Sequence, residues 1–492
     1  MTTVPSIRIQ DCNGAPICRD GQFVLYWMIA FRRTTWNFSL QRAVEWAKSL
    51  QKPLVIFEPL RIGYRWASER LHRFVLDGMA DNLERLEPLR RYGVFYYPYV
   101  EPTEGYGKGL LAALARRACV VVTDNYPSFF LPRMVQAAAQ RLSVRLEQVD
   151  SNGLLPLRAA DQVFVTAQSF RRFLHKQIAL HLENFPQPDP LAHVELPRLP
   201  YLPSAVVWRW PPLSIAQLHS DFLLLEQLAI DHSVKPVDYR GGPKAARLQL
   251  LDFLDQKLCH YHERANQPDD DCHSGLSPYL HFGHLSAHEI FTEVVQRQNW
   301  TPASLSVAAQ GKRKGFWGME PSAEAFLDQL LVWRELGYNR CSQTRDYDRF
   351  ESLPQWAQMT LIKHASDPRP HVYSLEQFEA ARTHDPLWNA AQTQLVREGR
   401  IHNYLRMLWG KKILEWSATP QQALTIMIEL NNKYGVDGRD PNSFSGIFWI
   451  LGRYDHPWPP ERPIFGVVRY MSSRNCMRKL RLREYLAQYG RN

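Results

Sequence analysis

Three tryptophans in the carboxyl-terminal part of the chain have a type and spacing that could carry chemistry. Trp388 begins one expected helix, and Trp409 and Trp416 lie seven residues apart on the next, about two turns apart on one face. Indoles that lie close together can pass an electron stepwise between solvent and a buried acceptor. Tryptophans in helices also serve as ordinary core residues. The spacing is compatible with both roles and does not decide between them.

A polar loop follows these helices. The helix expected before Asn431 leads into residues 435–445, which are rich in Gly, Asp, Pro and Asn and contain Asp437 and Asp440. A loop of this composition can place backbone amides and carboxylates around a polar ligand. Asn431 has a second interpretation as an ordinary helix cap.

A second candidate ligand segment lies upstream. Residues Ser274, Gly275, Leu276 and Ser277 follow an acidic turn and precede an expected helix. Hydroxyls and free amides at the amino terminus of a helix can bind an anion. The same residues can also act as a simple helix cap.

The elements that position these residues fall into two types. Over roughly the first 150 residues, short apolar runs alternate with amphipathic segments, which predicts a doubly wound, Rossmann-like parallel sheet with helices on both faces. No G-x-G-x-x-G follows the first strand, so the usual dinucleotide fingerprint is absent. The expected strands are 23–27, 53–57, 94–97, 119–123 and 143–149, and the expected helices are 38–50, 66–86 and 110–118.

The carboxyl-terminal part is expected to be nearly all helix. Eight prolines between residues 185 and 212 predict an extended connector. The predicted division is an α/β domain at 1–184, a connector at 185–214 and an all-helical domain at 215–492. The helical domain begins with a helix over 244–262, whose expected apolar stripe is Leu248, Leu251, Phe253, Leu254 and Leu258.

The composition indicates the kind of partner and the cellular compartment to expect. Lys and Arg total 59 against 49 Asp and Glu, a net charge of +10 that suits a polyanionic partner. The seven cysteines are scattered without a C-x-x-C pair, so neither a disulfide framework nor a metal site is indicated. No signal-peptide pattern and no spanning apolar run is present, which predicts a cytoplasmic protein without a membrane anchor.

Four motifs carry a resemblance to a known family. In order along the chain they are WNAAQ at 388–392, WGKKILEW at 409–416, LNNKYGVDGRDPN at 430–442 and ERPIFG at 461–466. Together they resemble class II cyclobutane pyrimidine dimer photolyases, in the cryptochrome/photolyase family. The match extends over most of residues 20–485 and is densest after residue 240.

The resemblance implies light-driven DNA repair by a non-covalently bound, reduced FAD in the helical domain. It implies electron relay through Trp409, Trp388 and Trp416, in that order from the flavin, with Asn431 beside flavin N5. It also implies a possible second, antenna chromophore of deazaflavin or folate type, with no ligands assigned. The residues that it implies for cofactor binding are Tyr261, Ser274, Gly275, Leu276, Ser277, Arg334, Asn431, Asp437 and Asp440.

The implied partner is double-stranded DNA containing pyrimidine dimers, bound by a monomer without sequence preference, near the nucleoid if the source is bacterial. The dimer must be flipped out of the duplex to reach a buried flavin. The residues implied for contact with DNA or the lesion are Trp333, Trp449, Met407, Arg462 and Arg469.

One position departs from the family pattern. Where active members carry a lesion-binding glutamate four residues before the position of Trp333, this chain has Gln329, with Asp328 beside it. Glutamine can donate and accept hydrogen bonds, but it cannot carry charge or release a proton. Gln329 therefore supports an alternative, a cryptochrome-like photoreceptor with weak or lost repair. A third interpretation, a simple nucleotide-binding or redox protein using the first domain, is disfavoured by the missing Gly-rich turn.

Overall fold

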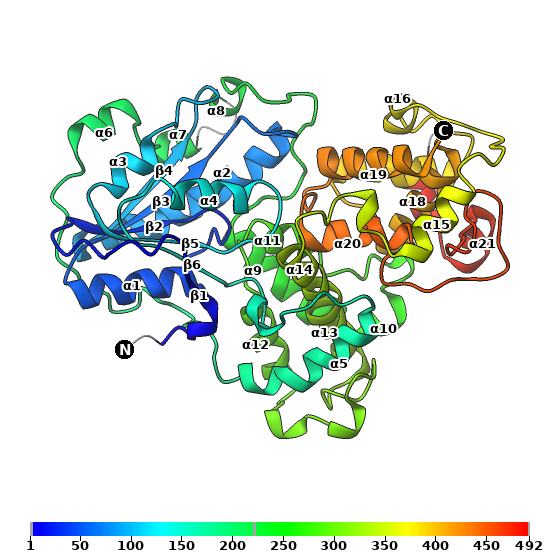
Figure 1. Cartoon of the computed structure of the whole chain (residues 1–492), viewed down its shortest axis with the longest axis horizontal. Helices are drawn as coiled ribbons and strands as arrows, with labels where there is room; N and C mark the ends of the chain where they lie inside the picture. The colour runs from blue at the N-terminus through cyan, green and yellow to red at the C-terminus, as the bar shows by residue number, and fades with distance from the viewer. Residues whose placement is uncertain (1–2, 220–222, 491–492) are drawn as a thin grey trace. The chain divides into compact units, whose positions relative to one another are not determined.

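A computed structural model describes residues 3–219 and 223–490 (Figure 1). The chain forms two compact units, one made of residues 1–159, 177–251 and 276–299, and one made of residues 160–176, 252–275 and 300–492. The connector predicted at 185–214 therefore lies inside the first unit. Its residues Leu191, Val194 and Leu196 pack in the core of the sheet, which is why the proline-rich segment does not mark a boundary.

The first unit contains a six-stranded sheet in the order β1-β6-β5-β2-β3-β4. All neighbouring strands are parallel except β1 and β6, so the predicted parallel sheet is confirmed and gains an antiparallel edge. The sequence does not signal β1, because its three residues are mostly exposed and form no apolar run. The strands are β1 (Ile9–Asp11), β2 (Phe23–Trp27), β3 (Leu54–Leu60), β4 (Val94–Val100), β5 (Ala118–Asp124) and β6 (Leu146–Val149).

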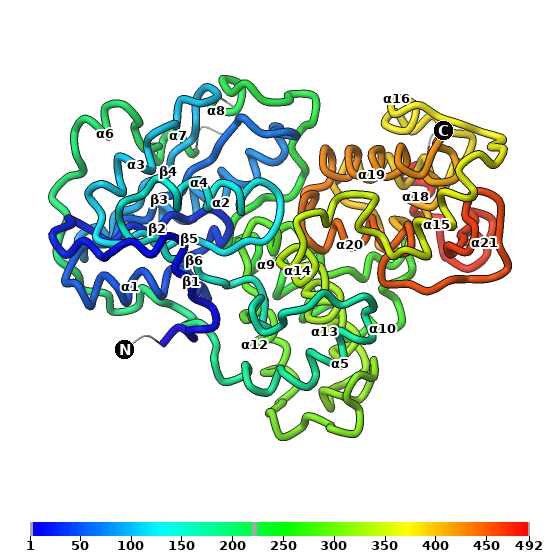
Figure 2. Tube along the Cα trace, viewed as in Figure 1, coloured from blue at the N-terminus to red at the C-terminus, as the bar shows by residue number. Residues whose placement is uncertain are grey.

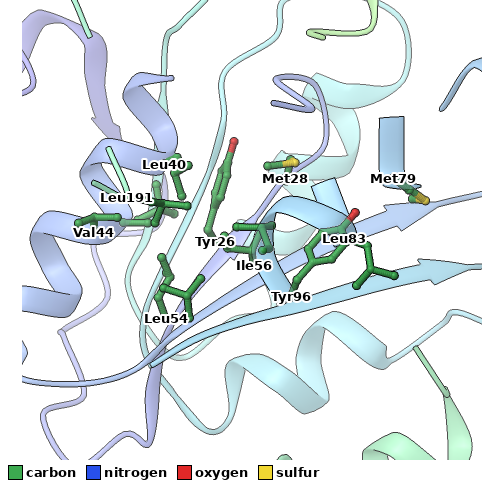
Figure 3. Close-up of a cluster of buried hydrophobic side chains, with 14 of the residues drawn as sticks. Tyr26, Met28, Leu40, Val44, Leu54, Ile56, Met79, Leu83, Tyr96 and Leu191 are labelled. Atoms are coloured by element: carbon green, nitrogen blue, oxygen red, sulfur yellow. The ribbon is translucent and has the colours of Figure 1, made fainter. Parts of the chain in front are cut away.

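Helices cover both faces of this sheet. The chain runs outward through β2, β3 and β4 and then returns to β5, and right-handed crossovers in opposite directions place their helices on opposite faces. Figure 3 shows the core formed where Tyr26 and Ile56 of the central strands meet Leu40 and Leu83. The crossover helices are α1 (Phe38–Leu50), α2 (Glu69–Leu86), α3 (Leu110–Ala115) and α4 (Leu131–Ala139).

The remainder of the first unit is helical. The helix expected over 244–262 is interrupted: α9 (Pro243–Asp252) is followed by a π-helical turn (Phe253–Lys257), a 3-10 turn and α10 (Tyr261–Arg264), and from residue 252 on this segment belongs to the second unit. The predicted stripe is wrong at Leu248, which is 70% exposed, because the buried face of α9 passes through Ala246 and Leu250. The other helices here are α6 (Ser204–Arg209), α7 (Ile215–His219), α8 (Leu223–Glu226), α11 (Ser277–His281) and α12 (Ala287–Arg297).

The second unit is all-helical in its described residues, as predicted, and Figure 2 follows its chain through α18, α19 and α20. These three helices pack on one another. No helix in the described ranges is long and apolar enough to cross a membrane. Its helices include α5 (Ala167–Gln177), α13 (Pro321–Leu327), α14 (Arg334–Gln343), α15 (Gln355–Lys363), α16 (Leu375–Glu379), α17 (Pro386–Glu398), α18 (Asn403–Trp416), α19 (Pro420–Tyr434), α20 (Pro441–Ile450), α21 (Ser473–Lys479) and α22 (Arg483–Tyr489).

Candidate functional site

The three tryptophans lie on two consecutive helices, as the sequence predicts. Asp385 caps α17 by accepting a hydrogen bond from the backbone N–H of Trp388 at 3.0 Å, and Pro386 occupies the first helical position. This cap fixes Trp388 in the first turn of α17. Trp409 and Trp416 both belong to α18.

Tertiary packing brings the three indoles together. The ring centroids of Trp388 and Trp416 are 6.1 Å apart, and Nε1 of Trp388 donates to the carbonyl oxygen of Trp409 at 2.9 Å. All three side chains are at most 3% exposed. Nε1 of Trp409 donates at 2.9 Å to Oε1 of Gln392, a buried residue inside the WNAAQ motif whose role the sequence analysis missed. Trp388 thus contacts both other members of the trio.

The ring of Trp416 is covered by other aromatic groups. His384 lies 4.9 Å and Tyr373 lies 5.8 Å from Trp416, centroid to centroid, and the Tyr373 hydroxyl is 2.7 Å from Nδ1 of His384. Burial, and then the charge of His371, lower the pKa of His384, which favours a neutral imidazole that can accept from the tyrosine. Tyr373 is half-buried, so this end of the trio leads towards the surface of the unit.

Asn431 lies in the last turn of α19 and is 4% exposed. Its amide nitrogen donates to Oγ of Ser443 at 2.8 Å and to Oδ1 of Asn432 at 3.0 Å. The same Asn432 oxygen accepts the backbone N–H of Arg439 at 2.9 Å, which sets the orientation of both amides. Within the described residues the side-chain oxygen of Asn431 accepts no hydrogen bond, so it is free to accept one from a ligand.

The loop after α19 is held close to this pair. Arg439 adopts a positive φ of 69°, and its side chain is 3% exposed. Asp440 caps α20 by accepting the backbone N–H of Asn442 at 2.8 Å, and its other oxygen accepts the hydroxyl of Tyr338 at 3.1 Å. Asp437 lies 3.5 Å from the guanidinium of Arg406. The carboxylates expected to bind a cofactor are therefore also tied into the protein.

Arg334 connects this loop to the helix that carries Trp333. Its guanidinium carbon lies 4.3 Å from the ring centroid of Tyr338, whose hydroxyl donates to Asp440. A Cβ added at Gly337 would lie 2.7 Å from the carbonyl oxygen of Pro441, so only glycine allows α14 to approach the start of α20 this closely. Arg334, Tyr338 and Asp440 form one connected group at this contact.

Gly275 adopts a φ of +66°, which explains a glycine in the turn after Ser274. Leu276 is buried, and Ser277 begins α11, which belongs to the first unit. Tyr261 begins α10, and its ring lies 5.8 Å from that of Phe253.

Two histidines beside this turn escaped the sequence analysis. The rings of His273 and His402 meet edge to face with centroids 4.4 Å apart. Nε2 of each is buried with no hydrogen-bond partner in the described residues. Burial, and then the charge of His273, lower the pKa of His402 to about 3, so its imidazole is neutral near pH 7. A bound polar group would satisfy these two ring nitrogens.

Gln329 and Trp333 lie in a π-helical turn, Asp328–Trp333, inserted between α13 and α14. A π turn is a feature common at functional sites, and no pattern in the sequence predicted this one. Gln329 is exposed and Trp333 is half-buried. Asp328 is paired with Arg171 through two hydrogen bonds of 2.7 and 2.9 Å, and Arg171 is 1% exposed.

Trp449 and Arg469 come together in the same unit. Trp449 is half-buried near the end of α20, and the guanidinium carbon of Arg469 lies 5.3 Å from its ring centroid and 4.0 Å from that of Trp458. Asp455 lies 3.3 Å from Nε of Arg469 and accepts Nε1–H of Trp458 at 3.1 Å.

The other predicted DNA contacts are Arg462 and Met407. Arg462 is exposed, with its guanidinium carbon 5.3 Å from the ring of Tyr470, and Met407 is half-buried on α18.

These residues fit a flavin in their chemistry. The open oxygen of Asn431 can accept from a ring N–H, and the buried Nε2 atoms of His273 and His402 have no hydrogen-bond partner among the described residues. The carboxylates of Asp437 and Asp440 offer acceptors to hydroxyl groups. No group of three or more metal-binding side chains occurs in the described part of the chain.

The first unit contains a separate cavity of about 740 Å³ that the sequence analysis did not find. It opens at the carboxyl ends of β2, β3 and β4, where open α/β sheets commonly bind ligands. Its lining is mainly aromatic and apolar, with charged groups at a few points, and includes Trp27, Phe57, Tyr99, Glu101, Phe129 and Met134.

The sequence is similar to several characterised proteins over nearly its whole length. It is 35% identical over 480 residues to a deoxyribodipyrimidine photo-lyase of Methanothermobacter thermautotrophicus, covering 97% of each chain. It is 32% identical over 483 residues to the protein of the same name from Potorous tridactylus, covering 97% of this chain and 82% of that one. Similarity to Cryptochrome-1 of Drosophila melanogaster is 29% over 186 residues, or 35% of this chain.

The fold is similar to that of a solved structure. A bacterial class III photolyase from Agrobacterium tumefaciens matches with a TM-score of 0.63 at 16% identity, covering 89% of this chain and 82% of that one. No protein-family model matches the sequence. At this identity, the structural match bears on the fold alone.

Proposed function

Because the chain belongs to the deoxyribodipyrimidine photolyase family, we propose that it splits cyclobutane pyrimidine dimers in double-stranded DNA in a light-dependent reaction, as a class II enzyme with bound FAD. The observation that supports this most strongly is that three buried indoles contact one another in the helical unit that also holds Asn431, whose side-chain carbonyl accepts no hydrogen bond from the described residues. When bound and reduced, FAD would supply, on excitation by light, the electron that opens the cyclobutane ring.

Asn431 would accept a hydrogen bond from the reduced flavin ring. Its amide nitrogen donates to Ser443 and Asn432, which leaves the oxygen as the group that would accept a hydrogen bond from the flavin. An acceptor at this position favours the form of the ring that carries the proton. The rest of the cofactor would be held by Asp437, Asp440, Arg334, Tyr261 and the segment from Ser274 to Ser277.

The three tryptophans would pass electrons to an oxidised cofactor and so reduce it. We assign Trp409 as proximal, Trp388 as middle and Trp416 as distal relay. The hydrogen bond from Trp388 to the backbone of Trp409, and the 6.1 Å between the rings of Trp388 and Trp416, support a continuous path. Burial excludes water from the indoles and so protects oxidised intermediates from side reactions.

Trp333 and Trp449 would contact the flipped lesion with their flat apolar faces, with Met407 nearby. Arg462 and Arg469 would bind phosphates on either side without reading base sequence, so affinity should fall with salt. We propose that the protein acts as a monomer on damaged duplexes.

Gln329 keeps the photoreceptor alternative open. It would offer the lesion a neutral amide, and the carboxylate of Asp328 is held by Arg171 and cannot easily replace a missing glutamate. The two functions are separated by incubating purified, reduced protein with a dimer-containing oligonucleotide under blue light and measuring restored thymines. Light-dependent restoration supports repair. Photoreduction of bound FAD without any restoration supports the photoreceptor.

We propose that the cavity at the carboxyl ends of β2, β3 and β4 holds an antenna chromophore of deazaflavin or folate type. Its 740 Å³ suits a flat aromatic ring system, and its aromatic lining offers stacking partners. Reconstitution of the protein with a deazaflavin and with a reduced folate, followed by an excitation spectrum of repair, tests this assignment. An excitation spectrum that follows FAD alone in both cases contradicts it.

A further inference from the structure

A fully buried lysine lies beneath one of the two tryptophans assigned to the lesion. Lys411 on α18 has no exposed surface, and its Nζ lies 5.5 Å from the ring centroid of Trp449. The same Nζ donates to the carbonyl oxygen of Ile450 at 2.5 Å. Lys411 cannot reach DNA itself, but it contacts the segment that presents Trp449.

The location of this amine has a structural cause. Ile450 is the last residue of α20, and the final carbonyls of a helix lack intrahelical partners and carry partial negative charge. A Cβ added at Gly410 would overlap Ile450, so α18 and α20 are in close contact beside Lys411. The ammonium therefore caps α20 one residue after Trp449.

Two further charged groups act on this amine. Asp455 favours the charged form of Lys411, whereas Arg469 disfavours it. Arg469 packs on Trp449 and on Trp458, and Asp455 lies between the arginine and Trp458. Two cations thus contact the Trp449 ring, and one of them, Arg469, is paired with the carboxylate of Asp455.

Burial lowers the pKa of Lys411 to about 7, with Arg469 acting in the same direction and Asp455 opposing it. The charge on this amine therefore changes near neutral pH. A neutral amine can still donate to Ile450, but it loses its attraction to the π face of Trp449 and to the helix end.

We propose that Lys411 is a positioning residue for Trp449, and that its charged form holds the indole in the orientation that receives the flipped dimer. This inference rests on the proposed function. Because phosphates bring negative charge near the amine, binding of damaged DNA should draw a proton onto Lys411. Discrimination between damaged and undamaged duplex should therefore decrease as pH rises through neutrality.

The test compares the holoenzyme with three variants. Dissociation constants are measured by fluorescence anisotropy at constant ionic strength, from pH 6 to pH 9, for a duplex with one thymine dimer and for the same duplex undamaged. Discrimination is expressed as the dissociation constant for undamaged duplex divided by that for damaged duplex. For the wild type, we expect this ratio to fall roughly three- to ten-fold from pH 6 to pH 9, which is the magnitude of one cation–π contact. Lys411→Met should have the low ratio at every pH.

Two variants separate charge from hydrogen bonding and from general effects. Lys411→Gln retains a donor for Ile450 without a charge and should also give a low, flat ratio, and it serves in place of the Met variant if that protein does not retain FAD. Lys412→Met is the matched control, because Lys412 is the neighbouring near-buried lysine and pairs with Glu415 at 2.5 Å. It should keep the wild-type pH profile.

Wild-type pH dependence in Lys411→Gln or Lys411→Met would overturn the proposal. A wild-type protein that discriminates damaged DNA equally at all pH values would also overturn it, while leaving the proposed repair function intact. If the protein does not discriminate damaged from undamaged duplex at any pH, it does not bind the lesion. That result would reject both the proposed repair function and the proposed role of Lys411.

Discussion

Replacing Gln329 by glutamate tests the position at which the chain departs from its family. A hydrogen bond that involves a charged group contributes about 1.5–3 kcal/mol, and each 1.36 kcal/mol changes a rate tenfold. Gln329 is exposed, so water weakens its interactions, and the lower end of this range, about a tenfold increase in repair, is expected for Gln329→Glu. The carboxylate of Asp328 should not mask the gain, because both of its oxygens bind Arg171.

The assay measures dimers repaired per photon absorbed, with damaged DNA at saturation and FAD fully reduced. FAD content is measured in parallel, and it should be unchanged because the Gln329 side chain is exposed and the substitution leaves its backbone contact with Arg334 in place. Gln355→Glu is the control for added charge, since Gln355 is an exposed residue at the start of α15. If the wild type repairs dimers and Gln329→Glu is no faster, the reasoning about the missing carboxylate is refuted. Absence of repair in both proteins would favour the photoreceptor.

Four further predictions follow from the site and the cavity. Trp409→Phe should slow photoreduction by at least tenfold with FAD still bound, since it removes the indole that we propose lies nearest the flavin; an unchanged rate in flash photolysis would return the three tryptophans to a packing role. Asn431→Ala should lower the midpoint potential of bound FAD in a spectroelectrochemical titration, because the reduced ring loses its acceptor; an unchanged potential would contradict that contact. Ala137→Trp, which partly fills the 740 Å³ cavity, should abolish uptake of a second chromophore while repair by directly excited FAD continues. Lys411→Met should be more stable than the wild type at pH 7, because folding lowers the pKa of Lys411 from 10.5 to about 7, a shift that costs the wild type up to about 5 kcal/mol. Chemical denaturation should show this difference in unfolding free energy shrinking as pH rises towards 10.5, where the lysine of the unfolded chain also becomes neutral.

Local patterns in the sequence were sufficient to predict most of the elements. The parallel strands and the helices from Phe38 to Leu50 and on both sides of Gly399 follow from periodicities of two and 3.6 residues, which depend on near neighbours. The cap at Asp385 and Pro386 is equally local. The proposed chemistry could also be named from the sequence: residue type alone allows electron transfer by the indoles, and the family resemblance implies an amide beside a flavin.

Burial and pairing were decided only by the tertiary structure, because they depend on residues far apart in the sequence. The pairing of Asp328 with Arg171, 157 residues away, removes a carboxylate that the sequence left available. The predicted connector at 185–214 packs against the sheet, because its apolar residues are buried in the core of the first unit. Lys411 is one of two adjacent lysines whose burial the sequence did not predict, and the packing of α18 against α20 makes it a buried group with a pKa of about 7. A side chain's charge state depends on the water and charges that the fold leaves around it, and no local pattern records those.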